Sequence, residues 1–238
     1  MRRGRGRGLD ELLSDLFLLL YLIVDAYERG KAIKEETRLQ KLVFLAEREM
    51  LVRRVKAFDY NFIRLTFGPY SDELRRDLAR LLECGLIYDD PGKGLIPTEK
   101  GLRLIEKMRD VIDKYGEVVE IIHKMNEEYA GMPLEKLLEH VYNLRRPLKG
   151  PKVAIKEVKI RTPLLRRISE DRAKVIFRIP GDRMKVLEAY FDPEVEEVLH
   201  EKVKGFEVLL LRYKGERGYT VIVPKLEIVF PNSKGKRK

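Results

Sequence analysis

Apolar residues recur every three or four positions through the first part of the chain and predict two helices there. Residues 9–28 are apolar over most of their length, which predicts a helix that is buried on nearly all sides. Residues 37–52 repeat the spacing with polar positions between, and Thr37 and Gln40 fit a capping box at the start of this helix. The two segments predict a helical core.

The apolar pattern changes after the second helix. Phe58, Tyr60 and Phe62 occupy every second position, which is the period of a short, half-buried strand. A Gly-Pro-Tyr run at residues 68–70 then breaks the chain, because glycine and proline interrupt both helices and strands. We expect one strand in this region and a break behind it.

The stretch that follows predicts a helix, a hairpin and a second helix. Ser71 is placed to cap a helix whose leucines form one stripe, and Gly85 stands where that helix should end. Short apolar runs flank a Pro-Gly-Lys-Gly turn at residues 91–94, as in a β-hairpin. Thr98 caps a further long helix. Helix, tight hairpin and helix in this order predict a winged helix-turn-helix, which is mostly α with a small β wing.

The long helix after Thr98 carries a wide apolar face within residues 102–125, of the width found in helical bundles. Gly116 lies in its middle and costs ~1 kcal/mol relative to alanine, so a kink or break is expected there. The apolar face has two interpretations. It joins two copies of the chain in a homodimer, or it packs against the chain's own first helix.

The second half of the chain has a different composition. Residues 150–172 are rich in arginine with interspersed glycine and proline, and predict a basic linker with one short strand at 153–160. The residues after it predict a small α+β unit of βααββ order. Its elements are expected as a strand at 175–179, helices at 182–190 and 193–203, and paired strands at 206–213 and 219–230.

These segments divide an α+β chain into five parts. The order is a disordered basic tail at 1–8, a winged-helix domain at 9–149, the linker at 150–172, a small α+β domain at 173–231 and a basic tail at 232–238.

The net charge of +10 belongs to the two ends of the chain. Residues 1–8 hold four arginines and residues 233–238 hold four basic residues, without an acid in either segment. Apart from these eight, 41 basic side chains stand against 39 acidic ones. Flexible basic arms strengthen non-specific binding to phosphate without selecting a base sequence. A purely solubilising role is the alternative.

Composition further narrows the class of protein. A charged fraction of 37%, one glutamine, one cysteine and no tryptophan are typical of a thermophilic cytoplasmic protein. Cys84 is alone, which excludes a disulfide framework within one chain. The longest apolar run, residues 16–24, is far shorter than the about 20 residues that a membrane span needs. We expect no membrane partner.

Signals of catalysis are few. The chain has no Walker A, G-x-G-x-x-G or G-x-S-x-G sequence. His123, His140 and His200 lie far apart, each in a different predicted helix and without metal-ligand spacing. Glu157 and Lys159 match half of a nuclease site, but the acid that such a site needs upstream is not evident. We expect no enzyme, no cofactor and no metal.

The helix from Ser71 would enter the major groove if the winged helix binds DNA. Its outward residues are expected to be Arg75, Arg76 and Arg80, because arginine contacts both phosphate and the guanine edge. The wing offers Lys93 at its tip. The tails would add phosphate contacts from Arg2, Arg3, Arg5, Arg7, Lys236 and Arg237.

Acidic residues on the same helix oppose this interpretation. Asp72, Glu73, Asp77 and Glu83 make the helix slightly negative overall. The pairs Asp72–Arg76 and Asp77–Arg80 then serve as surface ion pairs that leave little charge for DNA.

Three motifs resemble the Panacea domain family, which includes SocA-like antitoxins and YwgA-like proteins. They are an LQKL-type helix at residues 37–46, a GPYS-type turn at 67–71 and a helix that closes on Gly-Leu-Ile at 82–87. Residues 134–147 are similar to a downstream helix of the family, and the resemblance covers roughly residues 36–147. It implies a winged-helix-like fold. Several members are antitoxins that bind DNA, a cognate toxin or both.

Two hypotheses of function follow from the sequence. The first is a winged-helix protein that binds double-stranded DNA, as a transcriptional regulator or a nucleoid-type protein. The second is an antitoxin-like or adaptor module that holds a protein partner such as a toxin. In the second case the C-terminal α+β unit, with its apolar strand at 206–213, would carry the contact.

Overall fold

The computed structural model describes residues 7–146, 153–167, 169–203 and 205–224. Within these residues the chain is a mixed α+β protein with eight α-helices and several small sheets of two or three strands. None of these helices is both long enough and apolar enough to span a bilayer.

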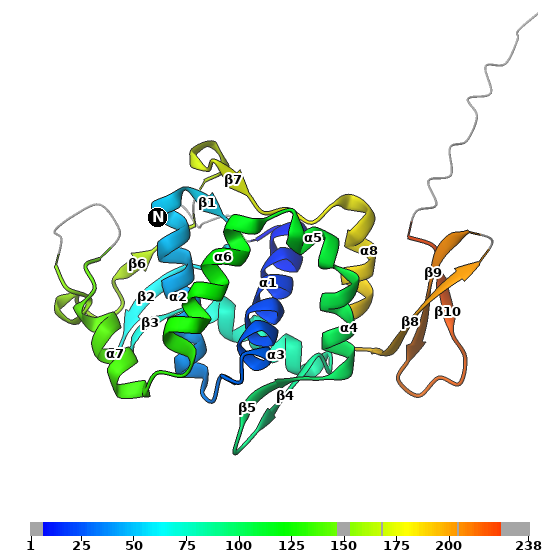
Figure 1. Ribbon diagram of the computed structural model, residues 1–238, viewed down its shortest axis with the longest axis horizontal. Coiled ribbons are helices and arrows are strands. Elements are labelled where there is room, and N and C mark those ends of the chain that lie inside the picture. The colour runs from blue at the N-terminus through cyan, green and yellow to red at the C-terminus, as the bar shows by residue number, and fades with distance from the viewer. Residues whose placement is uncertain (1–6, 147–152, 168, 204, 225–238) are drawn as a thin grey trace, which may run out of the picture.

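Helix α1 (Leu9–Glu28) lies at the centre of the helical body (Figure 1) and confirms the helix expected at residues 9–28. Every residue from Leu13 to Ala26 is buried, which explains why the segment has no polar stripe. The helices that contact it are α3 (Asp72–Glu83), α4 (Glu99–Lys107), α6 (Gly116–Met125) and α8 (Gly181–Tyr190).

Helix α2 (Glu36–Arg53) confirms the second predicted helix, but its start differs from the prediction. Glu35 occupies the capping position and no side chain caps the helix there, so the capping box of Thr37 and Gln40 is wrong. Gln40 instead hydrogen-bonds the backbone of Ser71 in both directions. A contact that joins two distant segments replaces the local one.

Helix α3 begins and ends as predicted. The Ser71 hydroxyl accepts a hydrogen bond from the Leu74 backbone, and Gly85 has the positive φ of 64° that suits a residue after a helix. Strands β4 (Ile87–Asp90) and β5 (Gly94–Pro97) then form the expected hairpin, which projects from the helical body in Figure 1.

The α1–α2 loop adds a third segment to this hairpin. Ile33 forms an antiparallel bridge with Leu95, whose backbone N–H donates to the Ile33 carbonyl at 2.8 Å. Gly94 makes the close approach possible. A Cβ atom at this glycine would lie 2.3 Å from the Ile33 carbonyl oxygen and 2.5 Å from Cα of Lys34.

The segment between α2 and α3 departs from the prediction. Residues 57–60 are buried without forming a strand, and strand β2 (Phe62–Leu65) starts only at Phe62. The Gly-Pro-Tyr run forms the next strand, β3 (Gly68–Tyr70), paired with β2. Phe58 and Tyr60 are large aromatic residues because the core encloses them, and not because they lie in a half-exposed strand.

The helix expected after Thr98 is broken into α4, α5 (Arg109–Asp113) and α6. Gly116 is the first residue of α6, so the predicted break is confirmed. Most apolar residues of this segment are buried against α1 and α2 of the same chain. The segment continues through a π-helical turn (Asn126–Ala130) into α7 (Leu134–Asn143).

The stretch expected as a linker contributes to the core wherever it is described. Residues Ile155–Glu157 form a 3-10 helix instead of the strand predicted at 153–160. Strand β6 (Pro163–Leu165) pairs with β2 and buries Leu164 completely. The proline stands first in its strand, where its missing N–H interrupts no ladder.

The C-terminal part has one helix fewer than predicted. Strand β7 (Val175–Ile176) pairs in parallel with β1 (Val55–Lys56), and α8 confirms the helix expected at 182–190. The helix expected at 193–203 is wrong, because these residues form the strand β8 (Val195–Val203).

Strand β8 pairs along its length with β9 (Phe206–Tyr213), and β9 pairs with the short β10 (Thr220–Ile222). The resulting three-stranded sheet stands at one end of the molecule (Figure 1). Residues 225–230 of the expected last strand lie outside the described residues.

Candidate nucleic-acid interface

The basic residues that the sequence places on α3 and the hairpin have different environments. Arg75 and Arg76 are exposed on α3, and Lys93 is exposed at the hairpin tip. Arg80 is half-buried, and its Nε donates a hydrogen bond to the Phe191 carbonyl at 3.3 Å. Three of the four predicted residues are therefore accessible to a partner, and the fourth is engaged by the protein's own backbone.

Asp77 faces the core and not the solvent. Its carboxylate accepts two hydrogen bonds from the Arg7 guanidinium, at 2.6 and 2.9 Å, and one from the Tyr60 hydroxyl at 2.9 Å. The predicted surface pair with Arg80 is therefore wrong. Arg7 also pairs with Asp15 at 2.6 Å, and its side chain is only 10% exposed. The sequence predicts Arg7 in a flexible arm, but the structure shows it paired with two buried carboxylates.

A second acid of α3 is also withdrawn from the surface. Glu73 accepts hydrogen bonds from Asn61 and pairs with Arg167 at 3.0 Å. The expected Asp72–Arg76 pair is likewise wrong, because no ion pair joins these residues where the chain is described. The exposed charges left on α3 are balanced between Asp72, Glu83, Arg75 and Arg76.

A buried ionic network lies behind α3. Glu47 is 5% exposed and accepts the backbone N–H of Tyr60 at 3.0 Å. Burial raises the pKa of Glu47 well above its ordinary value, and the negative charge of Asp15 adds to this. Lys56 and Asp59 form a buried pair at 2.7 Å in the same region. Tyr60 connects this network to α3, because its hydroxyl donates a hydrogen bond to Asp77.

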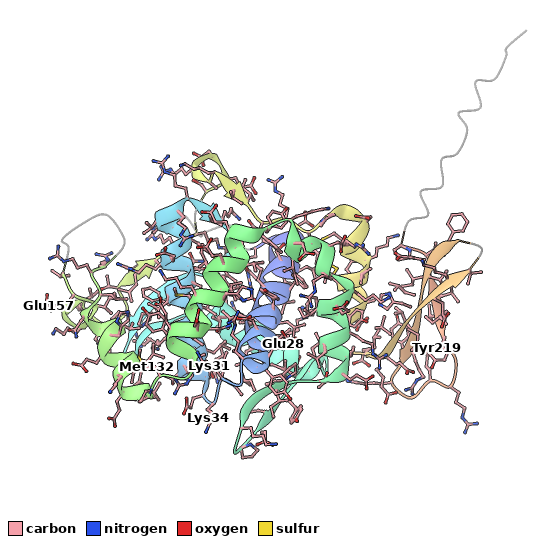
Figure 2. The ribbon with its side chains drawn as sticks, in the orientation of Figure 1. Glu28, Lys31, Lys34, Met132, Glu157 and Tyr219 are labelled. Atoms are coloured by element: carbon pink, nitrogen blue, oxygen red, sulfur yellow. The ribbon has the colours of Figure 1, made fainter. Side chains whose placement is uncertain are left out.

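The hairpin and the α1–α2 loop enclose a basic groove of about 560 Å³. Its walls include four basic residues and no acidic residue. Figure 2 shows two of the four, Lys31 and Lys34, along the edge of the molecule where Met132 also lies. The four basic residues of this groove are Lys31, Lys34, Arg38 and Lys93.

Two of these cations are held in place and two are not. Arg38 is buried and donates to the backbone carbonyls of residues 130 and 132, and Lys31 donates to the Glu127 carbonyl at 2.7 Å. Within the described residues, no hydrogen bond or ion pair engages the side chains of Lys34 and Lys93. The groove therefore presents two ammonium groups that are available to an anion.

The start of α2 joins this groove to α3. Lys34 and Arg38 line the groove, while Glu36, between them in sequence, shares a second pocket with Arg75. The first turn of α2 thus contributes both to the groove with its cations and to the pocket that contains Arg75.

The remaining predicted residues either are not described by the structure or lie away from this groove. Arg2, Arg3, Arg5, Lys236 and Arg237 lie outside the described residues. His200 is in strand β8 and not in a helix, beside the Tyr190 hydroxyl at 3.1 Å. Glu157 is exposed at a distant end of the molecule (Figure 2). Among the described residues, no group of three potential metal-binding side chains comes together.

Sequence reasoning missed Lys31, Lys34 and Arg38 as interface residues. The signal was present in the loop of residues 29–34, which contains three basic residues and no acid. Its meaning depends on the bridge between Ile33 and Leu95, which places this loop beside the hairpin. That pairing joins residues 62 positions apart and has no local sequence signature.

Comparison of the chain with protein-family models, with curated proteins and with solved structures gives no match. The similarity of residues 36–147 to the Panacea domain therefore stays a prediction.

Proposed function

We propose that this chain is a non-enzymatic winged-helix protein that binds double-stranded DNA, as a transcriptional regulator or a nucleoid-type protein. Helix α3 would enter the major groove, and the basic groove would hold the phosphate backbone beside it.

One observation carries the proposal. The groove beside the hairpin is lined by four basic residues and no acidic residue, in a chain whose charge is otherwise nearly balanced outside its ends. A local excess of positive charge on a balanced surface is the expected footprint of a phosphate backbone. Lys34 and Lys93 are the residues we assign to phosphate contacts.

The order and pairing of elements support the winged helix. Three helices precede the β4–β5 hairpin, and the bridge between Ile33 and Leu95 adds the loop after α1 to the hairpin sheet. The inward turn of Asp77 and the pairing of Glu73 also remove two acids from the face of α3 that would meet DNA. Arg75 and Arg76 are then the exposed cations of α3, balanced by Asp72 and Glu83 and without an excess of negative charge.

The test is fluorescence anisotropy of a labelled duplex titrated with the full chain at several salt concentrations. Lys34→Ala/Lys93→Ala should weaken binding to all duplex sequences alike and reduce the salt slope by about 2, because each lost phosphate contact removes about one unit. The matched control is Lys185→Ala/Lys202→Ala, which removes two exposed lysines from α8 and β8.

Equal losses in both double variants would show that the groove has no special role. Unchanged binding in the groove variant would contradict the proposal for these two lysines. Absence of duplex binding by the unaltered chain would contradict the function itself.

A specific observation also favours a second candidate function, which is binding of a protein partner. Val203, Phe206 and Val221 are each more than half exposed. The strand register places them on one face of the β8–β10 sheet, opposite the face that packs on the helical body. Apolar side chains gathered on a protruding sheet are typical of an interaction surface.

Salt dependence separates the two candidates. An apolar protein contact changes little with salt, whereas duplex binding weakens steeply through counterion release. Phe206→Ser/Val221→Ser should abolish capture of a toxin-like partner if the sheet face binds one, and should leave duplex binding unchanged.

A further inference from the structure

We propose that the pocket between the start of α2, the β2–β3 turn and Arg75 binds a small organic carboxylate, and that the bound carboxylate opposes DNA binding. The effect on DNA binding rests on the proposed function. The carboxylate site is argued from the pocket alone.

A buried ammonium group without a counterion lines this pocket. Lys41 is 2% exposed, and its Nζ donates one hydrogen bond, at 2.9 Å, to the Pro69 carbonyl. No carboxylate pairs with it within the described residues. Lys56 is also buried, but its charge is paired, because its Nζ donates to the two Asp59 carboxylate oxygens at 2.7 and 2.8 Å. An ammonium has three donors, so Lys41 retains capacity for an anion.

The environment of Lys41 disfavours its charge in the absence of a ligand. Burial and, to a smaller extent, the positive charge of Arg64 lower the pKa of Lys41 to about 8, while Glu36 opposes the shift. An anion placed beside the ammonium would reverse this effect. Unpaired buried charge is costly, and a matching ligand relieves that cost.

The pocket has the size and access for a small molecule. Its volume is about 340 Å³, within the range of small-ligand sites. Gly68 keeps the lysine approachable, since a Cβ atom there would lie 3.4 Å from Cε of Lys41. Gly68 also has a φ of 94°, which other residues rarely adopt.

The lining favours a monoanion with an apolar body. Two cations, Lys41 and Arg75, stand against one acid, Glu36, so the walls carry a single net positive charge. Leu65 and Phe67 supply apolar surface, and the Phe67 ring is 65% exposed. An aromatic or aliphatic carboxylate matches both the positive charge and the apolar surface, whereas a free phosphate dianion matches only the positive charge.

Arg75 connects the pocket to the DNA interface. It lines the pocket and is also one of the two exposed arginines that we assign to the major groove. A carboxylate bound between Lys41 and Arg75 would neutralise the arginine and turn it away from DNA. Ligand and duplex would then compete for the same side chain.

The experiment uses benzoate as the probe, with benzamide as its neutral counterpart and inorganic phosphate as an anion without an apolar body. Calorimetry on the full chain should detect benzoate and neither of the others. Lys41→Met should abolish benzoate binding, and Arg75→Ala should weaken it roughly tenfold to a hundredfold, as expected for a lost charge-assisted hydrogen bond. Arg217→Ala, in an exposed turn, is the control that should bind normally.

Lys41→Met removes a buried charge with little change of volume, so thermal unfolding should show a folded variant. Benzoate binding that survives in both Lys41→Met and Arg75→Ala would overturn the site. Phosphate that binds as tightly as benzoate would overturn the carboxylate class. A duplex affinity that falls in Lys41→Met, without any benzoate binding to the original chain, would identify a DNA phosphate as the anion and overturn the proposal.

Benzoate should also weaken duplex binding by the original chain and leave that of Lys41→Met unchanged. Benzoate binding without an effect on DNA would overturn the coupling and keep the site. A chain that binds benzoate but no duplex would overturn the proposed function, and with it the coupling, while the carboxylate site stands.

Discussion

Gln40 and Ser71 hold each other through two hydrogen bonds across 31 residues of sequence. The Gln40 amide donates to the Ser71 carbonyl at 3.0 Å and accepts from the Ser71 backbone N–H at 2.9 Å. Ser71 in turn caps α3. The one glutamine of the chain thus fixes α2 to the residue at which α3 begins, and so sets the position of the helix that we assign to DNA.

We predict that Gln40→Ala lowers the free energy of unfolding by about 1–3 kcal/mol, because it leaves a buried backbone donor and acceptor without partners. Chemical denaturation measures this difference. Thr37→Ala is the informative control. A capping role for Thr37 predicts a loss of about 1 kcal/mol, whereas the uncapped start of α2 predicts almost none. A larger loss from Thr37→Ala than from Gln40→Ala would contradict this account.

Arg7 is predicted to stabilise the fold and not only to add charge. Arg7→Ala leaves the carboxylates of Asp15 and Asp77 buried without their cation, which typically costs about 3–5 kcal/mol. Thermal unfolding should show a clear drop in Tm, while the exposed Arg172→Ala should show almost none. An unchanged Tm in Arg7→Ala would mean that the pairing contributes nothing to stability. Deletions designed to test the N-terminal arm should therefore end before Arg7.

The buried carboxyl of Glu47 gives stability a defined dependence on pH. Burial raises its pKa above the ordinary 4.5, so the folded state binds more protons than the unfolded state above that pH. Stability from this group is therefore present at low pH and falls as pH rises toward the folded-state pKa. Glu47→Gln keeps an oxygen for the Tyr60 N–H and should flatten the decline of stability above pH 4.5.

The measurement is the free energy of unfolding at a series of pH values for the original chain and for Glu47→Gln. Titrating groups that do not interact with Glu47 contribute equally to both chains and cancel in the difference, whereas Asp15 is coupled to Glu47 and its titration changes with the substitution. Glu188→Gln, at an exposed position on α8, is the control. Identical slopes in all three proteins would contradict a buried, protonated Glu47.

Substitution by alanine should destabilise the protein at one glycine of the hairpin and be tolerated at another. Gly94→Ala places a Cβ within 2.5 Å of backbone atoms of Ile33 and Lys34, at a φ of 92° that alanine rarely adopts. We expect at least ~2 kcal/mol of lost stability and weaker duplex binding, because the hairpin must separate from the α1–α2 loop. Gly92→Ala meets only the Asp90 carboxylate, at 3.5 Å, and should be tolerated. Equal stability of the two variants would contradict the close packing.

Elements whose signals are local could be predicted from the order of residues alone. The leucine stripe between Ser71 and Gly85, the turn at residues 91–94 and the continuous apolar run of α1 each specify their own structure. Caps, turns and helical spacing act over a few residues, so they are visible without knowing what lies nearby. The break at Gly116 belongs to the same class.

The partners of the polar residues, in contrast, depend on the folded arrangement of the chain. Gln40 fits a capping box locally, Asp77 fits a surface pair and Arg7 fits a flexible arm, yet all three are buried in contacts with distant residues. The helix predicted at 193–203 fails for the same reason, because pairing with β9 outweighs its local spacing. Burial makes an unmade hydrogen bond costly, so the fold selects the partners that can enter the core, and these are rarely sequence neighbours.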